Sequence, residues 1–158
     1  VLLAIIASMY AVYHGPEGLT TIARRVVGLT RTLANGLSEM GYQLAHRDYF
    51  DTIELKLESS PYRMAQIRER GLAARFNFRE VDDLHLCITL DERSTLDEVD
   101  RLLAVFAPAG TKPRKAAAIA ESIDASFAQG LARSTSFMTH EVFHRHRSEH
   151  EMLRYIHA

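Results

Sequence analysis

The spacing of apolar residues changes partway along this 158-residue chain, and that change limits the folds open to it. Between Leu19 and Met40 apolar residues recur every three or four positions, as on one face of an amphipathic helix. From Ile53 to Leu57, and again from Leu84 to Leu90, apolar residues stand at every second position, which is typical of strands with one wet face. The chain therefore combines a long helix with strands.

Local signals predict where several helices begin and end. Gly15-Pro16 breaks the helix before it, and proline suits the first turn of the next one. Gly41 follows the last apolar position of the stripe, where a left-handed cap residue is expected. Thr95 and Glu98 form a capping box ahead of a further apolar stripe that ends at Phe106. These signals predict three separate helices.

The remaining elements lie between these helices. We expect a short strand near 43–46, and a helix that opens at Ser60-Pro61 and is weakened or ended by Gly71. Phe76 and Phe78 alternate with polar residues, so a strand there would pair across Asp82-Asp83 with the run from Leu84, as a hairpin. This order predicts an α+β fold with an antiparallel or mixed sheet covered by helices on one face.

Composition divides the chain into three parts. Residues 1–106 hold the predicted small α+β subdomain with its leading helices. Residues 107–114 are rich in proline, glycine and short polar residues and are predicted to be a linker. In the tail, 115–158, an alanine-rich helix is expected over 116–131, and five of the eight histidines follow between 140 and 157. We expect this tail to be mostly helical.

Charge and cysteine content exclude several classes of function. The formal net charge is -1, so no basic surplus favours a nucleic-acid or anionic-membrane partner. Cys87 is the single cysteine, which excludes an intramolecular disulfide and fits a reducing cytoplasm or organelle matrix. The apolar run from Val1 to Tyr13 is too short for a membrane helix, which needs about 20 residues. Because it is apolar on all sides, we expect a helix cut away from its neighbours, in a fragment of a longer protein.

Three groups of residues, in order along the chain, carry a resemblance to a known family. They are Val1–Pro16 with the helix from Gly18; Tyr49–Thr52, Asn77–Arg79 and Ile88–Glu92; and Thr139-His140, Val142-Phe143, Ser148-Glu149 and Met152–Tyr155. Together they resemble the amino-terminal half of glycine dehydrogenase (decarboxylating), the P-protein of the glycine cleavage system. The resemblance covers nearly the whole chain but only a minor part of the family's length.

The resemblance implies a fold and a reaction. Residues 1–106 would be the small carboxy-terminal subdomain of the first, cofactor-free copy of an aminotransferase-like pyridoxal phosphate fold. The tail would lead towards the second half of the parent chain. In that parent, which is expected to be dimeric, pyridoxal phosphate supports decarboxylation of glycine and passes the aminomethyl group to the lipoyl arm of the H-protein. Cytoplasmic location, or the mitochondrial matrix in a eukaryote, follows.

The fragment itself is expected to hold neither catalytic nor cofactor-binding residues. The family anchors its cofactor on a lysine in a His-Lys motif beside a glycine-rich stretch, in the second copy. The lysines here are Lys56, Lys112 and Lys115, and none follows a histidine. We therefore expect no pyridoxal phosphate on this fragment, and a structural role for it.

A zinc-dependent hydrolase is the alternative, because His140-Glu141-Val142-Phe143-His144 is a literal H-E-x-x-H motif. On one helix the two imidazoles would share a face and Glu141 would act as the base, with His150 at the position of a third ligand. Arg147 stands where that longer pattern needs a glycine to turn the chain back. We therefore favour a charged, solvated helix with no metal.

Three further residues receive structural interpretations. Arg79 would grip a substrate carboxylate in a complete aminotransferase-like enzyme, but in a cofactor-free copy an ion pair or an interface role is favoured. His14 is expected to tie down a helix end. Cys87 alternates with core leucines, so it should lie on the opposite face of the sheet without an activating base.

Overall fold

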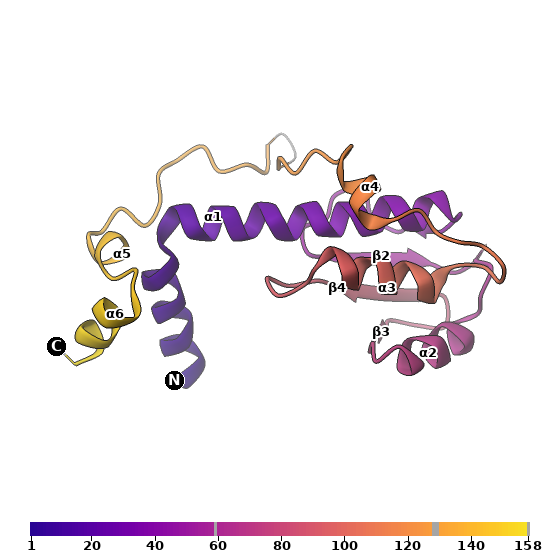
Figure 1. Cartoon of the computed structure of the whole chain (residues 1–158), viewed down its shortest axis with the longest axis horizontal. Coiled ribbons are helices and arrows are strands. Elements are labelled where there is room, and N and C mark those ends of the chain that lie inside the picture. Colours follow the sequence, from indigo (N-terminus) through magenta and orange to yellow (C-terminus); the bar gives the residue numbers. More distant parts are fainter. Residues whose placement is uncertain (59, 128–129, 158) are drawn as a thin grey trace. The chain divides into compact units, whose positions relative to one another are not determined.

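The computed structural model of the chain describes residues 1–58, 60–127 and 130–157. Within it the chain forms two compact units, one made of Val1–Arg24 with Phe127–Ala158 and the other of Arg25–Ser126. The elements, drawn in Figure 1, are α1 Leu2–Glu39, β1 Gln43–Leu44, β2 Thr52–Lys56, α2 Met64–Ala73, β3 Arg79–Glu80, β4 His85–Thr89, α3 Leu96–Phe106, α4 Ala116–Ala120, α5 Val142–Arg145 and α6 Glu149–Ile156. The predicted α+β class is confirmed.

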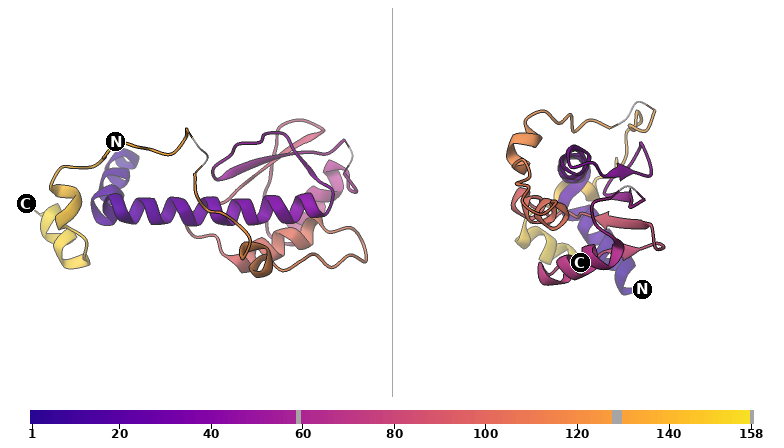
Figure 2. Two further views of the ribbon diagram at one scale, coloured as in Figure 1. Left: turned by 90° about the horizontal axis from the view of Figure 1, so that it is seen from above. Right: turned by 90° about the vertical axis from the view of Figure 1, so that its right-hand side faces the viewer.

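The sheet belongs to the second unit and has the order β1-β2-β4-β3, with every pair antiparallel. The register places Ile53 opposite Ile88 and Leu55 opposite Leu86, so the apolar positions of both central strands share one face. All four side chains are buried. The second part of α1 and α3 cover this face, as the views in Figure 2 show, and their leucines complete one core.

The two glycine signals on α1 are both confirmed. Gly15 has φ 63° and ψ -179°, which interrupts the helix just ahead of Pro16. At the other end, Gly41 has φ 91°, while the N–H of Tyr42 donates to the carbonyl of Leu37 and that of Gly41 to Ser38. This pair of bonds is the Schellman arrangement, which satisfies carbonyls that the helix end leaves free.

Two predicted boundaries in the middle of the chain are wrong. Gly71 does not end its helix, because α2 continues to Ala73. A Cβ on Gly71 would lie 2.6 Å from Cε2 of Phe78, so glycine serves close packing here. The strand predicted around Phe76 and Phe78 begins only at Arg79. The rings of both phenylalanines pack against the core, and the backbone that carries them does not pair in the ladder. The hairpin across 81–84 is confirmed.

The helix expected over 116–131 is also much shorter than predicted. α4 covers only Ala116–Ala120; a turn follows at 121–122, and residues 123–127 lie outside helices and strands. Positions 128 and 129 lie outside the described residues. Alanine-rich composition did not sustain the helix, because tertiary packing overrides propensity. Ile119 is buried against the core of the second unit. Residues 107–115 lie outside helices and strands, and the division at 107–114 stays a prediction.

The first unit combines the start of α1 with α5 and α6. Arg147, just before α6, donates from its guanidinium to Glu17 at 2.8 Å, and a Cβ on Gly15 would lie 2.6 Å from the same guanidinium. Large apolar side chains of Val1–Tyr13 stay exposed, as expected for a helix separated from its neighbours. None of the helices in the described ranges is long and apolar enough to cross a membrane.

Candidate functional site

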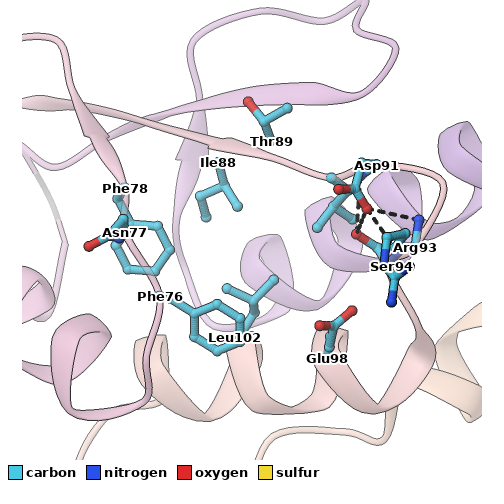
Figure 3. Close-up of a pocket in the computed structure, with 11 residues that line it drawn as sticks. Phe76, Asn77, Phe78, Ile88, Thr89, Asp91, Arg93, Ser94, Glu98 and Leu102 are labelled. Carbon is cyan, nitrogen blue, oxygen red and sulfur yellow. Dashed lines mark hydrogen bonds between the residues drawn. The ribbon is translucent and has the colours of Figure 1, made fainter. Parts of the chain in front are cut away.

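The candidate site is a pocket of about 270 Å³ in the second unit, between β4, α3 and the segment that joins α2 to β3. Figure 3 shows the rings of Phe76 and Phe78 on one side and the chain from Asp91 to Ser94 on the other. Ile88 and Leu102 form the apolar part of its wall, with Asn77, Thr89 and Glu98 among its polar residues. The pocket is thus half aromatic and apolar, with polar groups around it.

Asp91 shapes the polar side of the pocket. Its carboxylate accepts from the backbone N–H of Arg93 at 2.9 Å and of Ser94 at 3.0 Å, and from the Ser94 hydroxyl at 3.1 Å. The N–H of Arg93, with the donors of Ser94, holds the pKa of Asp91 below its usual value. Arg25 of α1 donates to the carbonyls of Glu92 and Ser94 and fixes this turn to the helix.

The second carboxylate is committed to local structure as well. Glu98 accepts from the backbone N–H of Thr95 at 3.0 Å, and the Thr95 hydroxyl accepts from the N–H of Glu98, which confirms the predicted capping box. Thr89 shares a hydrogen bond with Thr52 across the sheet. The pocket therefore offers shape, an aromatic wall and the cation of Arg93. The Ser94 hydroxyl contacts the Asp91 carboxylate, but that carboxylate is held by the turn, and its lowered pKa makes it a weak base.

This pocket was not predicted from the sequence. Asp91 followed three residues later by Ser94, directly ahead of a capping box, is a signal for such a turn. The contribution of Asn77 and the two phenylalanines could not be read, because it depends on the chain leaving the strand pattern before β3.

The geometry required for zinc on the H-E-x-x-H motif is absent. His140 precedes α5, and its Nδ1 accepts from the N–H of Val142, so it caps the helix instead of sharing a helical face with His144. The ring of His144 contacts the Met138 carbonyl at 3.0 Å and the Arg147 guanidinium at 3.3 Å. Within the described ranges no three His, Cys, Asp or Glu side chains are grouped to hold a metal.

The other candidates lie apart from the pocket. Cys87 sits on the outer face of β4, as predicted, and burial together with the Glu54 carboxylate raises the pKa of its thiol. Arg79 is exposed and lies opposite Cys87 in the ladder. His14 packs its ring against Tyr10 and Tyr13 at centroid distances of 4.3 and 5.2 Å, at the break in α1.

Comparison with known proteins decides the family. The profile described as "Glycine cleavage system P-protein" matches residues 1–106, which is more than half of the chain. The chain belongs to this family.

Relatives of this P-protein chain match it along its whole length. "Glycine dehydrogenase (decarboxylating)" of Variovorax paradoxus is 43% identical over 157 residues, which are 99% of this chain and 16% of the relative. The mitochondrial proteins of the same description from Flaveria anomala and Pisum sativum are 42% and 40% identical, over 98% and 99% of this chain and 15% and 14% of theirs. The chain therefore spans only about a sixth or less of the curated relatives it matches.

The residues of this P-protein segment do not fit pyridoxal phosphate. A cofactor site needs a lysine amine inside a pocket together with donors for the phosphate. Lys115 pairs with Asp100 at 2.9 Å, Lys56 lies on β2, and Lys112 is exposed between α3 and α4. None of the three lines the pocket described above. No catalytic step is therefore assigned to these residues.

Proposed function

We propose that the chain is a structural segment of a P-protein that decarboxylates glycine and passes the aminomethyl group to the lipoyl arm of the H-protein. Pyridoxal phosphate, held elsewhere in the parent chain, would supply the electron sink for decarboxylation. The parent would be dimeric and act in the cytoplasm, or in the mitochondrial matrix of a eukaryote. The observation that supports this proposal is the match of 157 residues to a glycine dehydrogenase at 43% identity.

A structural role is supported by how the polar groups are used. Asp91 and Glu98 hold a turn and a helix start, and Asp100 accepts from the N–H of Ala116 at 2.7 Å and from Lys115. Carboxylates committed in this way position the backbone and do not exchange protons with a substrate. We propose that residues 1–106 are the small subdomain of an aminotransferase-like fold, with 107–114 as the linker to the tail.

The experiment is a glycine decarboxylation assay on the intact protein with pyridoxal phosphate and H-protein. We expect release of carbon dioxide that depends on both additions. Replacing Lys56 or Lys115 by alanine is expected to leave kcat within about twofold, because neither amine would touch the cofactor. An intact, folded protein without glycine decarboxylation refutes the parent function, whereas loss of the cofactor's absorbance in Lys56→Ala refutes the structural role.

The zinc hydrolase alternative predicts a different result. It requires stoichiometric zinc in the purified protein and its loss in His140→Ala and His144→Ala. Because His140 caps α5 and His144 contacts the Met138 carbonyl, we expect no stoichiometric metal by elemental analysis.

A further inference from the structure

The part of α1 before Gly15 is a helix with large apolar side chains in the open. Its exposed fractions are 67% for Leu2, 80% for Leu3, 50% for Ile5, 54% for Ile6 and 39% for Tyr13, and Val1, directly ahead of the helix, is fully exposed. No charged side chain occurs between Leu2 and Tyr13. A cluster of this kind on a water-soluble protein marks a surface that another body covers.

The positions of these side chains around the helix indicate which of its sides another part of the protein must cover. Successive residues are about 100° apart on a helix, so Leu3 and Ile5 point to sides about 160° from each other. Both are half exposed or more, and Ile6, about 60° from Leu3 around the helix, is exposed as well. A helix that docks on one surface usually keeps a charged side for water, but no charged side chain marks such a side between Leu2 and Tyr13.

We infer that residues 2–14 form an interior helix of the parent protein, enclosed on opposite sides by parts of the same polypeptide outside these 158 residues. The relatives are long enough to supply the cover, since this chain spans 14–16% of their length. The family profile includes the segment, because its match starts at residue 1. The inference rests on the proposed function only in taking the parent to be a P-protein.

The test is thiol labelling of the intact protein in a cysteine-free background. Leu3→Cys and Ile5→Cys place a thiol on opposite sides of the helix, and Glu69→Cys, on an exposed position of α2, is the control. We expect both helix thiols to react with a maleimide at least about tenfold more slowly than the control, because enclosed positions label only through local opening. All three should label at equal rates in denaturant.

Three outcomes would overturn the inference. Equal labelling of helix and control thiols means an open helix, and protection of one side alone means docking on a single surface. Protection that disappears on dilution to the monomer assigns the cover to a second copy. Ala7→Cys and Met9→Cys report nearly the same two sides with smaller changes of volume, if the first pair does not fold. Glycine decarboxylation is assayed in parallel, so a protected helix in a protein without that activity removes the proposed function and leaves this inference standing.

Discussion

Replacing Arg70 is the most informative change in the second unit, because this side chain caps the carboxyl end of α3. Its Nε donates to the Val105 carbonyl at 2.5 Å, and one terminal nitrogen donates to Ala104 at 2.8 Å and Ala107 at 3.1 Å. The other contacts the hydroxyl of Tyr62 at 3.1 Å, and the guanidinium lies 4.5 Å from the centre of that ring. Carbonyls in the last turn of a helix have no partner within it, so Arg70 supplies what the helix lacks.

The magnitude follows from these contacts. Hydrogen bonds from a charged donor contribute about 1.5–3 kcal/mol each, but four bonds from one half-buried side chain are not additive. The cation at the helix carboxyl end contributes about 0.3–1 kcal/mol more. We expect Arg70→Ala to lower the free energy of unfolding by about 2–4 kcal/mol. Arg70→Lys should recover a minority of this loss, because an ammonium keeps the charge but not the planar fork.

Urea denaturation followed by circular dichroism measures this loss. Arg68→Ala, on the same helix, is the matched control, because Arg68 is exposed and its ion pair among the described residues is with the surface carboxylate of Glu80. Its loss should be clearly smaller than that of Arg70→Ala, since exposed ion pairs stabilise little. A loss below about 1 kcal/mol for Arg70→Ala, or equal stability of Arg70→Lys and wild type, would refute the capping argument.

Three further changes have signs that the structure determines. Gly71→Ala should lower the thermal midpoint, because the new Cβ meets the ring of Phe78 at 2.6 Å, whereas Gly28→Ala, with its nearest contact at 3.4 Å, should raise it; the reverse order would contradict the packing. Asp91→Asn should make the free energy of unfolding less dependent on pH in the acid range. Backbone donors of its turn lower the pKa of folded Asp91, so the stability that this carboxylate contributes is present above the ordinary aspartate pKa and is lost as pH falls. Urea midpoints measured across that pH range would show the difference. Iodoacetamide should alkylate Cys87 with a pH midpoint above that of a free thiol, because burial raises its pKa; a lower midpoint would indicate an activating group that the geometry lacks.

Signals confined to a few neighbouring residues predicted this fold well. Gly41 and the Thr95–Glu98 box end and begin helices as expected, because each depends only on the conformation of one turn. The alternation of apolar and polar residues predicted the central strands for the same reason. When one face of a strand is buried, only one alternation places its apolar residues on that face.

Signals that depend on distant packing failed. Phe76 and Phe78 alternate like strand residues, but their rings fill space against the core, and the ladder starts after them. Gly71 resembles a helix stop until the ring beside it is known. The pocket was missed for this reason too, because its two sides come from segments more than a dozen residues apart in the chain, 76–78 and 91–94, that only the fold brings together. No local period encodes such a contact.

The N-terminal part of α1 is a helix whose packing partners the sequence of this chain does not supply. A helix with apolar residues all round cannot be stable in water for its own sake, since helix formation alone gives little free energy and exposed apolar area adds none. Its sequence therefore specifies a surrounding protein that these residues do not contain. Leu3 and Ile5, open on opposite sides, show that the missing cover must reach both faces. The apolar composition of residues 1–13, which predicts a fragment of a longer protein, thus also predicts that the rest of the polypeptide provides apolar surface on opposite sides of this helix.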